Sequence, residues 1–173
     1  MAREDEEFTM IFNECYANLC RFVECLLGGH GAAQDIAQES FLRLYRFGPD
    51  SLPRAEARFW LYRVARNLAL NELNKRQTRS RLFGKIAEVF RLRPASPEES
   101  CEQSERQQIV LDLLGSLPEQ QRAALLLREQ EEMSYREIAQ VLNVTESKVK
   151  VDIFRARSAL RARWNKRSKA LTK

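Results

Sequence analysis

Several features are scarce in this 173-residue sequence, and each scarcity excludes a class of protein. Strand signals are almost absent, with little alternation of β-branched residues and no Asn-Gly or Asp-Gly turn, so a β fold is not expected. No apolar run approaches the roughly 18 residues needed to cross a bilayer. The acidic start MAREDEEF also lacks the charge pattern of a secretory signal. We therefore expect a cytoplasmic, all-α protein without membrane insertion.

Histidine and cysteine are rare, which argues against catalysis and metal binding. The only histidine, His30, lies in the glycine-rich stretch LLGGHGAAQD and is expected to be a solvated turn residue. The cysteines fit neither a disulfide framework nor the close pairs of a zinc knuckle; they are Cys15, Cys20, Cys25 and Cys101. We expect them to pack in the core, with a redox or metal role as the alternative. No nucleophile motif or phosphate-binding loop is present, so we expect no enzyme, no catalytic residue, no metal site and no cofactor.

What the sequence does contain is charge arranged in blocks. Residues 1–50 carry 4 basic and 9 acidic side chains, 51–93 carry 11 and 3, 94–132 carry 3 and 9, and 133–173 carry 11 and 3, for a net charge of +5. A surface without a polyanionic partner would mix the signs more evenly. Two separate basic blocks therefore indicate two separate contacts with nucleic acid.

Apolar residues recur at helical spacing along most of the chain. They predict a first helix through Leu26, with Cys15 in its buried stripe, a second helix over 32–47 and a third over 56–76. The pattern then decays, and PASPEESCEQSE has the composition of a linker that cannot bury itself. A new apolar stripe begins at Ile109. We predict two small helical domains, residues 1–78 and 106–173, joined by a flexible linker over 79–105.

The stretch SYREIAQVLNVTESKVKVDIF predicts a helix-turn-helix. Ala139 is small where the second helix crosses, Asn143 tolerates a positive φ, and Val149 anchors the second helix in the core. Thr145 suits the N-cap. The outward face of the second helix would carry Ser147, Lys148, Lys150, Val151, Phe154, Arg155 and Arg157. Its apolar members suit thymine methyl groups and its cations suit phosphates. A helical hairpin with a merely solvated basic rim is the alternative.

The third helix carries a polar stripe away from its core side. The stripe consists of Arg63, Asn67, Asn71 and Asn74, continued by Lys75 and further basic residues. Asparagine is a poor helix former, so its repetition on one face suggests a hydrogen-bonding role. The aromatic side chains nearby, Phe59, Trp60 and Tyr62, offer surfaces for unstacked bases. The alternative is that Trp60 lies in the core and the asparagines form an ordinary solvated face.

The second helix presents a mixed outer face: Asp35, Gln38, Glu39, Leu42 and Arg43. An exposed leucine among acidic residues is typical of a protein-docking surface rather than of a DNA contact. A protein partner and a nucleic-acid partner are therefore expected on patches of opposite charge.

Three segments, in this order, resemble the extracytoplasmic-function (ECF) group of bacterial sigma factors. They are DIAQESFLRLYRF, ARFWLYRVARNLALNELNKR and SLPEQQRAALLLREQEEMSYREIAQVLNVTESKVKVDIFRARSALR, and the resemblance covers about residues 8–78 and 106–164. It implies a sigma factor that binds core RNA polymerase, recognises promoters and promotes DNA opening, commonly held inactive by an anti-sigma factor.

The resemblance also assigns roles along the chain. It implies that the second-helix face docks on the clamp helices of the largest polymerase subunit, and that the 79–105 linker threads the polymerase channel. A loop over residues 54–59 and the face bearing Asn67 and Asn71 would capture a flipped base of the −10 non-template strand. Residues in this group are Arg58, Phe59, Trp60, Arg63, Asn67, Asn71 and Lys75. The helix over 145–157 would read the −35 duplex.

The sequence departs from the family pattern at several positions. Asn143 replaces the usual turn glycine, which the turn tolerates. Val151 and Asp152 stand where small polar and basic residues are common, so the preferred −35 sequence stays open. From the residues alone, two rivals also remain: a dimeric helix-turn-helix regulator that binds palindromic duplex tightly without polymerase, and a helical adaptor that binds only proteins.

Overall fold

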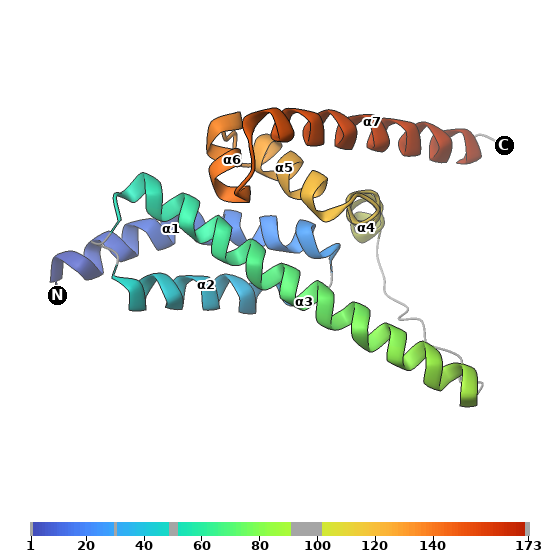
Figure 1. Cartoon of the computed structure of the whole chain (residues 1–173), viewed down its shortest axis with the longest axis horizontal. Coiled ribbons are helices and arrows are strands. Elements are labelled where there is room, and N and C mark those ends of the chain that lie inside the picture. The colour runs from blue at the N-terminus through green and yellow to red at the C-terminus, as the bar shows by residue number, and fades with distance from the viewer. Residues whose placement is uncertain (1, 30, 49–51, 91–101, 172–173) are drawn as a thin grey trace.

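The computed structural model describes residues 2–29, 31–48, 52–90 and 102–171, in which every regular element is an α-helix. The first domain contains α1 (Ala2–Leu27), α2 (Ala33–Phe47) and α3 (Arg54–Phe90). The second contains α4 (Glu102–Gly115), α5 (Glu119–Glu129), α6 (Tyr135–Leu142) and α7 (Glu146–Leu171), and the two groups lie one above the other in Figure 1. The predicted all-α fold with two helical domains is confirmed.

The first domain is built on the buried stripe of α1. Ile11, Cys15, Leu19, Phe22, Val23 and Leu26 are all buried, as their helical spacing predicts. Aromatic rings fasten α2 to this stripe: Phe41 lies 4.9 Å from Phe12 and 6.1 Å from Phe8, ring centre to ring centre, in edge-on contacts. The hydroxyl of buried Ser40 donates to the carbonyl of Ile36 at 2.7 Å. One face of α2 is thereby buried, and the other faces solvent.

The turn after α1 depends on glycine because α4 approaches it closely. Gly29 has φ = 82°, and a Cβ at this position would lie 2.7 Å from Cδ1 of Leu111 on α4. A side chain here would be strained by its backbone and would collide with its neighbour. The absence of a side chain therefore lets the second domain rest on the end of α1.

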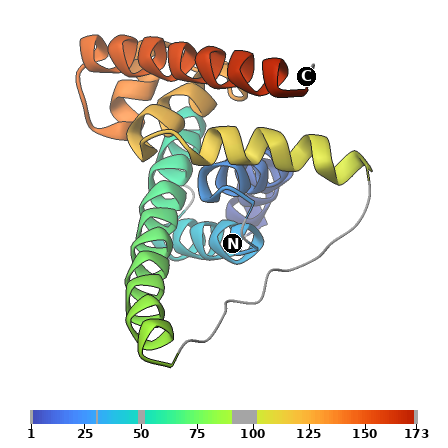
Figure 2. The same cartoon turned by 90° about the vertical axis from the view of Figure 1, so that its right-hand side faces the viewer.

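The third helix differs from its prediction at both ends. Residues 54–59, expected as a loop, form the first turns of α3, and the helix continues to Phe90 rather than ending near residue 76. No proline interrupts the sequence between Pro53 and Pro94, so helical propensity carries it on. The last part of α3 extends away from both domains (Figures 1 and 2). The two ends of the linker predicted over 79–105 are helical, since residues 79–90 belong to α3 and residues 102–105 to α4. His30 and residues 91–101, Cys101 among them, lie outside the described residues, so the domain bounds stay a prediction.

The helix-turn-helix has the predicted geometry. Asn143 ends α6 in the left-handed conformation, with φ = 54° and ψ = 52°. The hydroxyl of Thr145 accepts a hydrogen bond from the backbone N–H of Lys148 at 3.2 Å, so it caps α7 as expected. At the start of α6, Ser134 and Glu137 form a reciprocal capping box. The hydrogen bonds from Ser134 lower the pKa of Glu137.

The two domains contact each other in two places. Helix α1 contacts α4 and α5, and α3 contacts α6; Figure 2 shows α4 crossing over the end of the first domain. None of the described helices is long and apolar enough to cross a membrane.

Candidate nucleic-acid and polymerase interfaces

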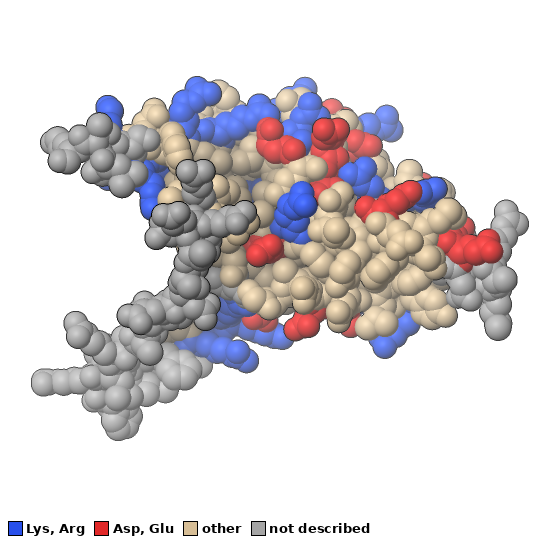
Figure 3. Space-filling view, turned by 180° about the vertical axis from the view of Figure 1, so that it is seen from behind, with Lys and Arg blue, Asp and Glu red and all other residues tan. Residues whose placement is uncertain are grey.

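The outer face of α7 is apolar at its centre and cationic at its edges. Phe154 is 72% exposed and Val151 is 42% exposed, while Val149 and Ile153 on the opposite side are buried. The remaining members of the predicted −35 set are also exposed: Ser147, Lys148, Lys150, Arg155 and Arg157. Figure 3 shows Lys and Arg side chains gathered along the upper edge of the molecule, over α7. The structure thus brings the predicted set together on one solvent-facing surface.

Three cations on this surface already have partners inside the second domain. Lys148 forms an ion pair with Asp152, Arg157 forms one with Glu129, and the ammonium of Lys150 lies 5.5 Å from the centre of the Tyr135 ring. Asp152 is 1% exposed, and its Oδ2 has no hydrogen-bond partner among the described residues. The carboxylate therefore tethers Lys148 to one side of the helix, which the sequence did not predict.

The predicted −10 residues share one region of α3. Arg63, Asn67, Asn71 and Lys75 are exposed, and Arg58, Phe59 and Trp60 are half-buried. The Trp60 ring stacks on Phe47 of α2 with centres 5.8 Å apart, so it lies at the edge of the core rather than inside it. A pocket of about 490 Å³ opens between Phe59, Trp60 and Arg63 on one side and Gln140 of α6 on the other.

Tyr62 was expected beside these aromatic residues, and that expectation is wrong. It is fully buried, and its ring makes an edge-on contact with Phe22 at 5.2 Å between centres. Burial, and secondly Glu131, raise the pKa of its hydroxyl. Leu61, Tyr62, Ala65 and Ala69 form the core-facing side of α3, so the Tyr62 ring is not accessible to a base.

The outer face of α2 is as mixed as predicted. Leu42 is 49% exposed and is flanked by the pair of Glu39 and Arg43, whose carboxylate and guanidinium lie 2.8 Å apart; Asp35 and Gln38 are exposed beside them. Tyr45 and Phe47, near the end of α2, are each 54% exposed, but Tyr45 packs edge-on against Phe8 of α1 and Phe47 stacks on Trp60 of α3. The exposure of these two rings was not predicted, because they lie at the end of the helix, next to a predicted loop.

Comparison with known proteins gives a family match for each of the two helical domains. The family model "Sigma-70 region 2" matches residues 11–79, and "Sigma-70, region 4" matches residues 107–160. The ECF RNA polymerase sigma-E factor of Salmonella typhimurium strain LT2 is 39% identical over 140 residues, covering 75% of this chain and 72% of the relative. The ECF RNA polymerase sigma factor SigM of Bacillus subtilis strain 168 is 29% identical over 163 residues, covering 94% and 95%.

The chain belongs to the ECF sigma factors of the sigma-70 family.

The fold of this sigma factor also occurs in solved structures. The sigma factor RpoE of Bartonella quintana, in a complex with the anti-sigma factor NepR, superposes with a TM-score of 0.71 at 21% identity, covering 91% of this chain and 96% of that one. CnrH, in a complex with the cytosolic domain of CnrY, superposes with a TM-score of 0.63 at 20% identity, covering 91% and 87%. At these identities the likeness establishes the fold alone.

Family membership settles the choice among functions. A sigma factor is a non-enzymatic transcription factor that directs RNA polymerase to promoters, so the predicted function is confirmed. The dimeric regulator and the protein-only adaptor are both excluded, because neither contains sigma region 2 followed by region 4.

Three cysteines lie among the described residues: Cys15 is buried, and Cys20 and Cys25 are half-buried. Cys15, Cys20 and Cys25 are free thiols, and burial raises the pKa of each. Within the described ranges, no cluster of three or more metal-ligating side chains occurs. Full or partial burial of these three thiols fits the packing interpretation.

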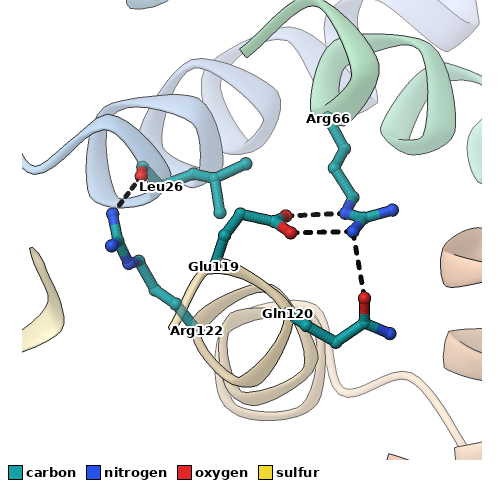
Figure 4. A network of polar contacts seen from close by, with 5 residues as sticks. All are labelled: Leu26, Arg66, Glu119, Gln120 and Arg122. Atoms are coloured by element: carbon teal, nitrogen blue, oxygen red, sulfur yellow. Dashed lines mark hydrogen bonds and ion pairs between the residues drawn. The ribbon is translucent and has the colours of Figure 1, made fainter. Parts of the chain in front are cut away.

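Arginine contacts between the domains are the feature that sequence reasoning missed. Arg66 binds both carboxylate oxygens of Glu119 at 2.7 and 2.8 Å, as Figure 4 shows. Arg58 binds the Glu131 carboxylate at 3.1 Å, and Arg63 donates to the carbonyl of Gln140 at 2.6 Å. Three arginines of α3 are therefore held by the second domain.

A fourth arginine extends from the second domain to the first. Arg122 of α5 is buried and donates to the carbonyl of Leu26, as Figure 4 shows. It also donates to the carbonyls of Gly115 and Leu117. Desolvation lowers the pKa of its guanidinium. Because it satisfies carbonyls at the end of α1, it fixes the second domain to the first as well as closing the turn between α4 and α5.

Proposed function

We propose that this sigma factor engages RNA polymerase and promoter DNA through three separate faces, and that residues 1–78, 79–105 and 106–173 form its region 2 domain, linker and region 4 domain. The −35 face comprises Ser147, Lys148, Lys150, Val151, Phe154, Arg155 and Arg157. The −10 face comprises Arg58, Phe59, Trp60, Arg63, Asn67, Asn71 and Lys75. The polymerase face comprises Asp35, Gln38, Glu39, Leu42 and Arg43.

The observation that carries the −35 assignment is the exposure of Phe154. A phenylalanine that is 72% exposed in the middle of a cationic helix face leaves most of its ring in water, which is unfavourable unless a partner covers it. In a major groove the ring can contact thymine methyl groups, while Lys150 and Arg155 reach phosphates. The left-handed turn at Asn143 supports this role, because it redirects α7 so that its N-terminal half can enter the groove.

The −10 assignment is supported by a pocket beside exposed amides. Phe59 and Trp60 line the pocket of about 490 Å³ and offer flat apolar surfaces for a base. Asn67 and Asn71 are exposed further along the same helix and can donate to and accept from a base edge. Unstacked bases of the non-template strand match both features, so this face would act after or during strand opening.

The polymerase assignment is supported by the chemistry of the outer face of α2. Leu42 lies among Asp35, Gln38 and the Glu39–Arg43 pair, away from both cationic faces. Protein interfaces combine such an apolar centre with a polar rim. We therefore assign this face to core RNA polymerase.

The protein would use the free energy of DNA binding to open the promoter. Two DNA-binding domains in one chain raise each other's effective concentration at the promoter, and captured bases offset the few kcal/mol needed to unstack each step. We further propose that the protein acts in the cytoplasm, where core polymerase is found. An anti-sigma factor is proposed as an inhibitory partner, supported by the complexes in which its two structural neighbours were solved.

The −35 assignment predicts that Lys150→Ala with Phe154→Ala weakens promoter binding by the reconstituted holoenzyme. We expect a loss of about tenfold or more, because each good base or methyl contact contributes roughly 1–3 kcal/mol. Gel shift on a promoter obtained by selection from a randomised library measures it. Lys166→Ala is the matched control, since Lys166 is an exposed cation further along α7. Equal losses in the variant and the control would contradict the assignment.

The −10 assignment predicts a separate defect in strand opening. Asn67→Ala with Asn71→Ala should lower the permanganate reactivity of thymines in the opened region several-fold, because the amides would bind only unstacked bases. Gel shift on duplex that stays closed, at low temperature, should give an unchanged affinity. A loss of duplex affinity as large as the loss of opening would show that these residues bind the double strand instead.

A further inference from the structure

Asp152 is a charged residue buried beneath the edge of the −35 face. It is 1% exposed, and the ammonium of Lys148, one turn earlier on α7, forms an ion pair with its Oδ1. Its Oδ2 is buried and makes no hydrogen bond to any part of the chain that the structure describes. Removing a carboxylate from water with a partner for only one of its oxygens is unfavourable. Stability of the fold therefore does not explain a carboxylate at this position.

The position of Lys148 is unfavourable for the helix as well. Its backbone N–H donates to the Thr145 hydroxyl at 3.2 Å, which places Lys148 in the first turn of α7. The partial positive charge of a helix N-terminus favours acidic side chains there and disfavours a cation. An i,i+4 ion pair is also weaker when the cation is on the N-terminal side, as it is here. Two residues that both reduce stability and that contact each other are better explained by a role in binding.

The pair lies along one edge of the −35 face. At about 100° per residue, Val151 and Phe154 lie at the centre of this face and Lys148 lies beside them. Lys150 lies along the other edge, where its ammonium is 5.5 Å from the centre of the Tyr135 ring. In a helix-turn-helix, the N-terminal residues of the second helix contact base edges in the major groove. Lys148, in the first turn of α7, is therefore placed to reach a base.

The ion pair leaves Lys148 able to bind DNA. A lysine ammonium has three N–H donors, and a single carboxylate oxygen occupies one of them. The Lys148 side chain is 48% exposed, although its partner is buried. An unrestrained lysine binds phosphates of any sequence, because its stem is flexible and its charge is compact. An ammonium held by Asp152 keeps donors that point in fixed directions, which suits the O6 and N7 acceptors of guanine.

We propose that Asp152 is a positioning residue for Lys148, whose ammonium it directs to the O6 and N7 acceptors of a guanine at one position of the −35 element. The proposal rests on the assignment of α7 to that element. Asp152 is buried and does not touch DNA, so it acts only by restricting where the ammonium lies. Its negative charge also opposes the attraction of Lys148 to phosphates of arbitrary sequence. The pair therefore raises sequence specificity rather than affinity.

The test measures base preference at each position of the −35 element. Holoenzyme reconstituted with the full-length protein selects binding sites from promoter fragments in which this element is randomised. Gel shift then measures its affinity for single-base variants of the selected site and for a duplex of random sequence. The variants are Lys148→Ala, Asp152→Asn and the two combined. Asparagine keeps the shape of aspartate and removes its charge. Asp152→Ala is a second variant that leaves no buried amide, and circular dichroism checks the helices of each protein.

Glu129→Gln is the matched control. Glu129 pairs with Arg157, another cation of the −35 set, and both side chains are about half exposed. The control therefore removes one negative charge beside a cation of α7 without releasing Lys148. It distinguishes a general gain of positive charge from the positioning of one lysine.

We expect Lys148→Ala to lower the preference for guanine at one −35 position by about tenfold. Asp152→Asn should lower the preference at the same position by at least about fivefold and leave the other positions unchanged. It should also raise affinity for random duplex, because the released lysine binds phosphates. The combined variant should show the same base preference as Lys148→Ala, since Asp152 acts only through that lysine. Glu129→Gln should leave every base preference unchanged.

The proposal is overturned if Lys148→Ala lowers no preference for guanine, or if the Asp152 variants keep the wild-type preference. It is also overturned if those variants weaken the preference at every position alike, or if Glu129→Gln has the same effect as Asp152→Asn. Failure of the proposed function gives a different result: wild-type holoenzyme would select no −35 sequence, or Phe154→Ala would leave the selection intact. Selection that depends on Phe154 but not on Lys148 or Asp152 would contradict the positioning role alone.

Discussion

Asn143 determines the direction of the helix that we assign to the −35 element. It adopts φ = 54°, a conformation that costs most L-residues roughly 1–2 kcal/mol and costs asparagine less. The sequence identified this residue because a two-turn helix stopped at a residue that tolerates positive φ, directly before a capping threonine. Local chemistry of this kind can be read from sequence, since every group involved lies within a few residues.

Substitutions at Asn143 should distinguish the free-energy cost of its left-handed backbone conformation from any stabilisation by contacts of its side chain. Asn143→Ala is expected to lower the free energy of unfolding by about 1 kcal/mol, because alanine in the left-handed region is strained. Asn143→Gly should be neutral or slightly stabilising. Urea denaturation followed by circular dichroism measures both. Equal destabilisation by glycine and alanine would mean that the amide makes a stabilising contact of its own.

Tyr62 illustrates what the sequence could not settle at the residue scale. Phe59, Trp60 and Tyr62 are close in sequence, and aromatic residues suit both a core and a base-stacking surface. The helix turns about 100° per residue, which directs Tyr62 into the core and leaves Phe59 and Trp60 half-buried. Aromatic chemistry alone does not distinguish these three neighbours, whereas their positions around the helix do.

At the scale of the element, adjacent residues of α2 lie on faces with different roles. Phe41 is 2% exposed and packs edge-on against rings of α1, whereas Leu42 is 49% exposed on the outer face. The helical period alone distinguishes these two faces. The period does not indicate where a helix ends. The end of α3 at Phe90, rather than near residue 76, could therefore not be predicted from it.

The faces of α2 predict opposite consequences for two neighbouring substitutions. Phe41→Ala should cost about 3–5 kcal/mol of unfolding free energy, because it leaves a cavity in the aromatic cluster. Leu42→Ala should change stability by less than about 0.5 kcal/mol but weaken binding to core polymerase. Urea denaturation and competition with another sigma factor for core enzyme measure the two effects. A stable Leu42→Ala protein with wild-type polymerase affinity would contradict the docking assignment.

At the scale of the whole molecule, the charge blocks predicted the partners but not the contacts between the two domains. The contacts between domains join residues 53, 73 and 77 positions apart: Arg66 with Glu119, Arg58 with Glu131, and Arg63 with Gln140. Periodicity and turn chemistry extend over a few residues and carry no information about such pairs. The alternation of sign along the chain was visible; that one acidic block lies against one basic block required the structure.

The most direct test of the account is run-off transcription with purified core polymerase on a library of promoter fragments. We predict that the full-length protein directs core enzyme to a specific subset of templates, and that Phe154→Ala reduces this transcription while Lys166→Ala does not. Without polymerase, the protein should bind the selected templates only weakly. No stimulation over core enzyme alone, or the same templates used equally well by the Phe154→Ala variant, would contradict it.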